Sequence, residues 1–278
     1  MKKYKIGYTT GVFDMFHVGH LNILRRAKEQ CEHLVVGVST DELVQHDKSK
    51  TPIIPFEDRM RIVQSIRYVD EVVPQINKDK MEAWQAIHFD AMFVGSDWQG
   101  TPQWNLFESQ FASLGVDIIY LSHTDGISST MLREKLSPPS GNIKIGYTQG
   151  TFDLFHVGHL NLIQHAKERC DYLVVGVNSD DLVKEYKHKI PVINENERVE
   201  IISSLTYVDA CHIVTTLDKI DAYSKFNFRT IYIGDDWKGN PRWEQTEKQL
   251  NAVGVDLVYL PHTNGISSSF LTEVIKRK

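Results

Sequence analysis

The sequence predicts an α/β protein with two similar domains, each built on a parallel sheet that has helices on both faces. The stretch GYTTGVFDMFHVGHLNIL at residues 7–24 recurs as GYTQGTFDLFHVGHLNLI at residues 146–163. In each half, apolar runs rich in β-formers alternate with amphipathic stretches, which is the pattern of strands joined by crossover helices. The unusual polar residues follow the predicted strands, at the sheet edge where such folds bind ligands.

The repeat also sets the domain organisation. A constant offset, the 139 residues between His17 and His156, relates the two halves from about Lys5 to Lys135 without a gap. This period is too long for a solenoid, whose repeats run about 20–50 residues. A short polar stretch with Pro and Gly at residues 137–142 marks a linker near Pro139. We therefore expect domains at residues 1–138 and 139–278, and a linker this short predicts that they pack together.

Local patterns predict the elements of the first half. Leu21, Leu24 and Ala27 would fall on one face of a helix, and the stretch around residues 104–115 ends at a glycine C-cap signal. We expect strands at residues 5–10, 33–39, 71–74, 91–98 and 116–122. We expect helices at residues 20–30, 57–69, 81–89 and 104–115, with a loop after the second strand.

Composition excludes several classes of function. The 278 residues carry a net charge of −5, which argues against binding nucleic acid or an anionic membrane through bulk charge. No apolar run reaches membrane-spanning length, and the N-terminus lacks the apolar core of a signal peptide. Three cysteines without CxxC spacing fit a reducing compartment. We expect a cytoplasmic protein with no nucleic-acid partner and no membrane insertion.

The first motif is the HVGH peptide, which predicts a phosphate site. His17 and His20 lie three residues apart at the start of a predicted helix, so they share a face. Free N–H groups at a helix start favour anions, and imidazoles can donate to phosphate oxygens as charge builds. Gly11 allows close backbone approach, and Gly19 would leave room for a phosphate.

Two other interpretations of the histidine pair stay open. The pair could bind a metal, although only Asp14 lies near as a third ligand, or it could be structural. The second copy keeps both histidines, His156 and His159, beside the corresponding strand end. That repetition favours phosphate binding, and we expect no protein-bound metal site.

A second motif is HTDGISST at residues 123–130, repeated as HTNGISSS at residues 262–269. Gly126 opens a turn, and hydroxyls then precede a helix-like stretch. Hydroxyl and N–H groups at a helix start can bind an anion, although a plain helix cap would look the same.

Two further clusters carry polar side chains. Lys48 and Lys50 on the predicted loop could neutralise phosphate, or they could simply be solvated. In GSDW at residues 95–98, Asp97 and Trp98 could contact a base, a ribose or a substrate hydroxyl. A buried tryptophan that needs one hydrogen-bond partner is the alternative.

Four features together resemble the cytidylyltransferase family in tandem-repeat form. They are the two HxGH pairs, RYVDEV at residues 67–72, GDDW at residues 234–237 and the GISS motifs. The likeness covers nearly all of each repeat. It is greatest to the bacterial glycerol-3-phosphate enzymes, with phosphocholine and phosphoethanolamine enzymes as more distant relatives. The resemblance implies two Rossmann-like domains and a CTP-dependent reaction that releases pyrophosphate. It also implies Mg²⁺ bound with CTP and a CDP-alcohol, such as CDP-glycerol, for teichoic acid or capsule.

The resemblance also implies roles for residues. Catalysis would involve His17, His20, Lys50 and Arg67, and in the second repeat His156, His159 and Lys189; Asp14 and Asp153 would contact substrate. The nucleotide would be bound in repeat 1 by Thr10, Gly11, Val12, Phe13, Lys48, Gly95, Asp97, Trp98, His123, Thr124, Gly126, Ile127, Ser128, Ser129 and Thr130. In repeat 2 it would be bound by Gly150, Thr151, Phe152, Lys187, Gly234, Asp236, Trp237, His262, Thr263, Gly265, Ile266, Ser267 and Ser268.

The sequence departs from the family pattern in places. His123 and His262 replace the arginine that begins the family motif, and the family tryptophan after RYVDEV is absent. Arg67 is replaced by Thr206 in the second repeat. We therefore expect repeat 1 to be the active site. We expect repeat 2 to bind nucleotide, with either a catalytic or a structural role. Because single-domain relatives form dimers, we expect an intramolecular pseudo-dimer, either as a monomer or as a further homodimer. An adenylyltransferase of the same fold is the other enzyme interpretation.

Overall fold

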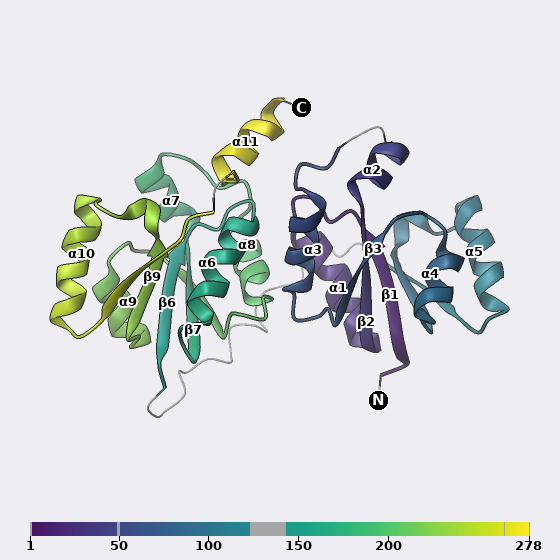
Figure 1. Ribbon diagram of the computed structural model, residues 1–278, viewed down its shortest axis with the longest axis horizontal. Coiled ribbons are helices and arrows are strands. Elements are labelled where there is room, and N and C mark those ends of the chain that lie inside the picture. Colours follow the sequence, from purple (N-terminus) through teal and green to yellow (C-terminus); the bar gives the residue numbers. More distant parts are fainter. Residues whose placement is uncertain (1, 49–50, 123–142, 264, 278) are drawn as a thin grey trace. The chain divides into compact units, whose positions relative to one another are not determined.

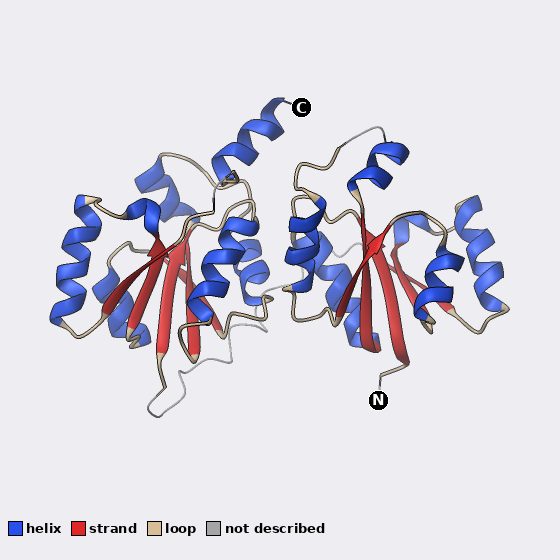
Figure 2. Ribbon diagram, in the orientation of Figure 1, coloured by secondary structure: helices blue, strands red, loops and turns tan. Residues whose placement is uncertain are grey.

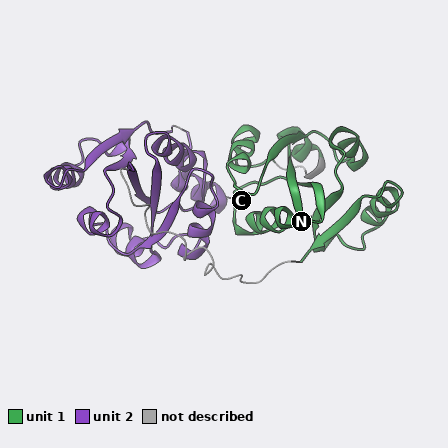
Figure 3. Ribbon diagram, turned by 90° about the horizontal axis from the view of Figure 1, so that it is seen from below, with its two compact units in different colours: residues 1–127 green, residues 128–278 purple. Residues whose placement is uncertain are grey.

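The computed structural model describes residues 2–48, 51–122, 143–263 and 265–277. The chain divides into two compact units, residues 1–127 and residues 128–278 (Figure 3). Residues 137–142, which the sequence marks as the linker, lie outside the described residues, so the predicted boundary near Pro139 stays a prediction. Among the described residues no helix is long and apolar enough to cross a membrane.

Each unit contains a five-stranded parallel sheet, as the sequence predicts (Figures 1 and 2). In unit 1 the strands lie in the order β3-β2-β1-β4-β5, and in unit 2 in the equivalent order β8-β7-β6-β9-β10. The chain first moves from β1 outward to β3 and then returns to the other side of β1. Because crossovers are right-handed, this reversal puts α1 and α3 on one face of the sheet and α4 and α5 on the other (Figure 1).

The elements of unit 1 have the following bounds. The strands are β1 (Tyr4–Gly11), β2 (Cys31–Ser39), β3 (Glu71–Gln75), β4 (Ala91–Gly95) and β5 (Asp117–Leu121). The helices are α1 (Val18–Gln30), α2 (Asp41–Lys48), α3 (Phe56–Gln64), α4 (Lys80–Ile87), the 3-10 helix η1 (Ser96–Trp98) and α5 (Pro102–Ala112).

Unit 2 repeats this series and adds a C-terminal helix. Its strands are β6 (Ile145–Gly150), β7 (Tyr172–Asn178), β8 (Ala210–Val214), β9 (Thr230–Gly234) and β10 (Asp256–Leu260). Its helices are α6 (Val157–Lys167), α7 (Asp180–Lys187), α8 (Glu195–Ser203), α9 (Lys219–Phe226), η3 (Asp235–Trp237), α10 (Pro241–Ala252) and α11 (Ser268–Arg277).

The cores follow the predicted amphipathic patterns. Leu21, Leu24 and Ala27 of α1 are buried, as the helical spacing predicts. On the other face, the rings of Tyr8 and Phe89 stack with centroids 5.0 Å apart beneath α4 and α5. Tyr147 and Phe228 repeat this stack in unit 2 at 4.7 Å.

Three predicted elements need correction. The helix expected over residues 57–69 ends at Gln64, because the N–H groups of Ile66 and Val69 bond to carbonyls three residues back and the chain then turns toward β3. The expected loop after β2 begins with helix α2, whose short length gives little periodicity. The strand expected over residues 91–98 ends at Gly95 and continues as η1.

A buried arginine joins the segments at the carboxyl edge of each sheet. The Arg59 side chain is fully buried and donates to the carbonyls of Val12 and Ile54 and to the Asp41 carboxylate, the last at 2.6 Å. Its guanidinium thus joins the loop after β1, the segment before α3 and the start of α2. Arg198 makes the corresponding contacts in unit 2.

We predict that Arg59→Lys destabilises unit 1 by about 3 kcal/mol, because one ammonium cannot span three separate acceptors and leaves buried partners unpaired. The measurement is urea unfolding of the full chain. Arg61→Lys on the exposed face of the same helix is the matched control, and it should change stability by less than about 0.5 kcal/mol. Equal unfolding midpoints for the two variants would contradict the bridging role of Arg59.

Candidate active site

The candidate site of unit 1 lies at the carboxyl end of β1, where the strand order reverses. In open α/β sheets the chain diverges at such a point and leaves a crevice for ligand. Two cavities flank the end of β1, with volumes of about 340 and 310 Å³. Both are lined by Thr10, Val94 and Trp98, so they meet at this strand end.

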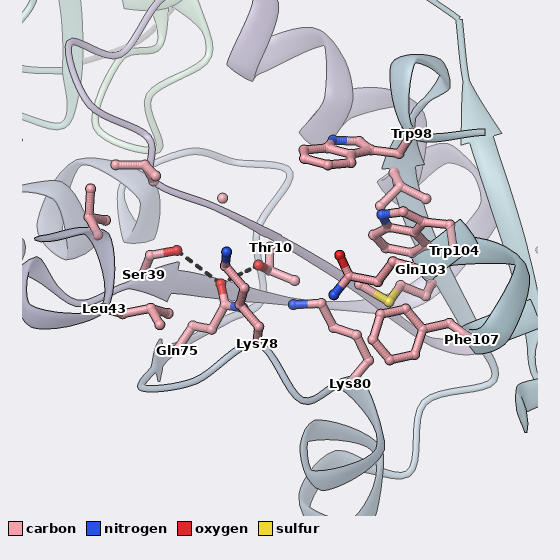
Figure 4. A pocket seen from close by; sticks show the side chains of 15 residues that line it. Thr10, Ser39, Leu43, Gln75, Lys78, Lys80, Trp98, Gln103, Trp104 and Phe107 are labelled. Atoms are coloured by element: carbon pink, nitrogen blue, oxygen red, sulfur yellow. Dashed lines mark hydrogen bonds between the residues drawn. The ribbon is translucent and has the colours of Figure 1, made fainter. Parts of the chain in front are cut away.

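The two cavities differ in chemistry. The smaller, which we call the histidine cavity, is lined by His17, His20, Arg26 and Asp97 among others. The larger, which we call the lysine cavity, is lined by Lys78, Lys80, Gln75, Gln103, Trp104 and Phe107 among others (Figure 4). The predicted nucleotide residues Gly11 and Val12 also line the lysine cavity.

His17 caps helix α1 with its own ring. Its Nδ1 accepts the Gly19 N–H at 3.0 Å, while its backbone is extended at φ −138°. Because Nδ1 is the acceptor, the proton of the neutral ring lies on Nε2, which is then a donor. His156 caps α6 in the same way through the Gly158 N–H at 3.1 Å. The helix start and the imidazole donor are therefore fixed by one interaction.

This geometry explains the glycine between the histidines. A Cβ on Gly19 would lie 2.8 Å from Cε1 and 2.9 Å from Nδ1 of His17. The space beside Gly19 thus holds the His17 ring, whereas the sequence had suggested that it holds phosphate. The ring of His20 stacks on His17 with centroids 3.9 Å apart, so the pair forms a single surface.

Burial keeps several of these imidazoles neutral. It lowers the pKa of His20 to about 3, with the neighbouring His17 as a smaller cause. Burial likewise lowers the pKa of His156 to about 4 and holds the pKa of His159 well below its usual value. Within the described residues, the buried Nδ1 atoms of His20 and His159 have no hydrogen-bond partner. A bound polyphosphate would bring the negative charge that favours protonation of these rings.

The predicted substrate residues Asp14 and Asp153 bind backbone. Asp14 accepts the N–H groups of Ile53 and Ile54 at 2.8 and 2.9 Å. Asp153 accepts those of Val192 and Ile193 at 2.9 and 3.0 Å. These carboxylates hold the segment before α3 or α8 against the HxGH loop. Substrate contact by either aspartate stays a prediction.

The GSDW turn joins the site through its tryptophan. Trp98 is about half exposed and lines both cavities, and Asp97 lines the histidine cavity beside Gly95. In unit 2 the matching turn meets the second motif, because Asp235 accepts the His262 N–H at 2.9 Å and the Asp236 carboxylate lies 3.8 Å from His262 Nδ1.

The second motif of unit 2 packs onto the HxGH peptide, and anion binding by this motif stays a prediction. The Ser268 hydroxyl donates to the Asp153 carbonyl at 2.6 Å and lies 3.5 Å from Nε2 of His156. Asn161 donates to the Thr263 hydroxyl at 2.8 Å. The Ser267 hydroxyl accepts the Phe270 N–H in the first turn of α11. Gly265 sits at φ +87°, where a glycine is favoured, and Ile266 follows it.

Several predicted residues are not brought to the described site. Arg67 lies in the turn before β3, at the amino edge of the sheet, and it is not among the described lining residues of either unit 1 cavity. Lys48 ends α2. In unit 2, by contrast, Lys187 at the end of α7 does line the cavity of its unit, and it donates to the Thr151 hydroxyl at 3.1 Å. Lys189 is exposed after α7. Outside the described residues lie Lys50 and the unit 1 motif residues His123, Thr124, Gly126, Ile127, Ser128, Ser129 and Thr130.

Sequence reasoning missed one pair of residues, the buried lysines Lys80 and Lys219. Each begins a helix, is at most 7% exposed and lines a cavity of its unit. Burial lowers the pKa of Lys219 to about 7, with Arg242 as a further cause. The available signal was the lysine at the same place in both repeats, because a buried ammonium is costly unless an anion or carbonyl compensates it.

The fold and the site define a nucleotidyltransferase, with a histidine-capped helix at the switch point of each sheet. The chain belongs to the family described as "Cytidylyltransferase-like", which matches residues 8–135 and 147–274, one match for each repeat. It is 28% identical to an ethanolamine-phosphate cytidylyltransferase of Dictyostelium discoideum over 97% of this chain and 89% of that protein. It is 36% identical to a glycerol-3-phosphate cytidylyltransferase of Bacillus subtilis over 46% of this chain and 95% of that protein.

We predict that acid destabilises the ligand-free protein through His20. Because its folded pKa is about 3, the folded state binds fewer protons than the unfolded state between pH 3 and 6.5. The free energy of unfolding therefore falls as the pH drops through this window. His20→Gln should reduce the decline of Tm between pH 7 and 5, measured by calorimetry. His88→Asn, which replaces an exposed ring, is the control and should show the same decline of Tm with pH as the parent protein. An unchanged decline of Tm in H20Q would contradict the prediction.

Proposed function

We propose that unit 1 transfers CMP from CTP to the phosphate of a small phosphorylated alcohol, with phosphoethanolamine as the first acceptor to test. The observation that carries this proposal is the meeting of the histidine cavity and the lysine cavity at Thr10 and Trp98. One cavity offers imidazole donors for a triphosphate, and the other offers two ammonium groups for a second phosphate. Two phosphorylated substrates could thus meet at the end of β1.

The reaction follows from this arrangement. An acceptor phosphate oxygen attacks the α-phosphorus of CTP and forms a new P–O bond. The bond from the α-phosphorus to the bridging oxygen breaks, and pyrophosphate leaves with that electron pair. Such a transfer needs positioning and charge neutralisation more than a covalent nucleophile. His17 would donate from Nε2 to the α-phosphate or the leaving oxygen, and Lys80 would orient the attacking phosphate.

Mg²⁺ enters this proposal as part of the substrate, the MgCTP complex. The described residues contain no group of three or more His, Cys, Asp or Glu side chains that could hold an ion. Triphosphate oxygens and water are therefore the expected ligands, as is common for Mg²⁺. Lys48 and Lys50 remain proposed sources of positive charge.

Two observations support phosphoethanolamine as the acceptor. A relative that matches 97% of this chain, both repeats included, is named an ethanolamine-phosphate cytidylyltransferase. In addition, Trp98, Trp104 and Phe107 line the lysine cavity (Figure 4). Aromatic faces attract an ammonium group, so the tail could lie on this wall while the phosphate meets Lys78 and Lys80.

Glycerol 3-phosphate, which the sequence favours, is the second candidate acceptor. Relatives named glycerol-3-phosphate cytidylyltransferases, which match about half of this chain, support it at the higher identity of 36%. The described lining of the lysine cavity contains no carboxylate, while Ser39, Gln75 and Gln103 could bond hydroxyl groups. A CDP-glycerol product would suit cell-envelope or capsule synthesis.

The test of the function is pyrophosphate release with each of the four nucleotides and with both acceptors. We expect CTP to be preferred, and phosphoethanolamine to give the higher kcat/KM in the chain with unit 2 disabled by His156→Ala and His159→Ala. Preference for ATP would support the adenylyltransferase interpretation instead. Activity that survives replacement of His17, His20, His156 and His159 together by alanine would refute the role of the histidines.

We predict that Lys80→Met raises the KM for the acceptor about 10- to 100-fold in the same background, because a hydrogen bond to a charged group contributes about 1.5–3 kcal/mol. The KM for CTP should change much less, since Lys80 lines only the lysine cavity. Methionine suits a buried site, so Tm should not fall. Lys5→Met, at an exposed lysine, is the control, and equal shifts in both KM values would contradict an acceptor-specific role.

A further inference from the structure

The acceptor sides of the two units have diverged, although their histidine pairs match. The unit 2 cavity, of about 190 Å³, is lined by His159, Lys219 and Trp243 among others. At the repeat offset, lining residues of the lysine cavity change chemical character. These changes include Lys78 to Leu217, Gln103 to Arg242, Thr10 to Gln149, Gln75 to Val214 and Phe107 to Thr246.

The pair of cations is retained but rearranged. In unit 1 both ammonium groups, those of Lys78 and Lys80, come from the chain at and before the start of α4 (Figure 4). In unit 2 Leu217 replaces Lys78, and Arg242 at the start of α10 lies near Lys219 instead. A third cation, Lys187 at the end of α7, also lines this cavity. Lys219 Nζ donates to the Leu217 carbonyl at 2.7 Å, and an Arg242 nitrogen lies 3.5 Å from the same oxygen.

The Asp218 carboxylate, next to Lys219 in the chain, acts to raise the pKa of that lysine, but it is not among the described lining residues of the cavity. The described lining of the unit 2 cavity contains no Asp or Glu. Lys219 is only 5% exposed, and its ammonium lies 5.7 Å from the centroid of the Trp243 ring. A phosphate dianion would offset the repulsion between Lys219 and Arg242. The retained charge pair is therefore better explained by an anionic ligand than by packing.

The same change disfavours a cationic tail. In unit 1 the aromatic wall of Trp104 and Phe107 has the neutral Gln103 beside it, and the cations of that cavity are the two lysines that would be neutralised by the acceptor phosphate. In unit 2 the wall keeps Trp243, but Arg242 takes the place of the glutamine. An ammonium group on this wall would meet a guanidinium, and like charges repel strongly in a partly buried site.

Polar side chains also narrow the cavity of unit 2. In unit 1 Gln75 reaches from β3 and accepts from the hydroxyls of Thr10 and Ser39 (Figure 4). In unit 2 the glutamine lies on β6 instead, where Gln149 donates to Asn178 at 2.8 Å and to the Thr216 carbonyl at 2.9 Å. The Tyr186 hydroxyl then bonds both Asn178 and Thr151. These groups leave less room for a tail and offer it amide and hydroxyl partners.

We propose that unit 2 is a second acceptor site, selective for a small phosphorylated alcohol with an uncharged, hydroxyl-bearing tail. Lys219 and Arg242 bind the phosphate of that acceptor, and Arg242 excludes acceptors that carry an ammonium group. This inference rests on the proposed function, because it assumes that both units use CTP. If both units are active in this way, one chain makes two different CDP-alcohols, each from its own molecule of CTP.

The test uses the full-length chain with one unit disabled at a time. Replacing His17 and His20 by alanine leaves unit 2, and replacing His156 and His159 leaves unit 1. For each chain the kcat/KM is measured with CTP and either glycerol 3-phosphate or phosphoethanolamine. We expect the ratio of glycerol 3-phosphate to phosphoethanolamine to be at least about tenfold higher for unit 2 than for unit 1.

A second variant tests the cause. Adding Arg242→Gln to the chain with only unit 2 should lower this ratio at least about threefold, since the repulsion is removed. Lys248→Gln removes one charge from an exposed position of the same helix and should leave the ratio unchanged. Tm reports whether each variant is folded.

The outcomes separate the inference from the proposed function. No product from unit 2 with either acceptor, or equal ratios in the two units, overturns the inference while the activity of unit 1 stands. An unchanged ratio in the R242Q variant also overturns it. No product from either unit with CTP overturns the proposed function itself.

Discussion

The site of each unit depends on a reciprocal tie between the HxGH loop and the segment before α3 or α8. In unit 1 the Arg59 guanidinium donates to the carbonyls of Val12 and Ile54, while the Asp14 carboxylate accepts N–H groups of Ile53 and Ile54. Each segment thus satisfies polar groups of the other inside the protein, where unpaired groups would cost most.

The tie matters because the loop that it holds is strained. Phe13 and Met15 have φ values of 54° and 45°, in the left-handed region, which costs free energy for residues other than glycine. The loop ends in extended backbone at His17, and that turn places the imidazole over the start of α1. The corresponding loop of unit 2 has the same backbone conformation, with Phe152 and Leu154 at φ values of 54° and 49°.

Much of this arrangement could be predicted from the sequence, and the exceptions have physical causes. Alternating patterns identified the parallel sheets, because buried strands and amphipathic helices leave local periodicities. Such periodicities say little about short helices such as α2, and nothing about which way a single polar side chain points. Lys80 was therefore missed, since the cavity that it lines is completed by side chains of β4 and α5, which no local pattern places beside it. The place of Arg67 at the amino edge of β3 likewise depends on where α3 ends.

The two units keep the same geometry around the histidines and differ in the other part of the site. The tie, the histidine cap and the histidine stack agree closely, with ring centroids 3.9 Å apart in unit 1 and 3.8 Å apart in unit 2. The differences gather on the other side of the first strand, around Gln75, Lys78 and Gln103. Under the proposed function, a triphosphate presents the same oxygens to the histidines whichever acceptor is used, so residues that bind it are constrained in the same way in both units. The acceptor side faces a tail that varies in size and charge, and a duplicated domain can change there without disturbing the histidines.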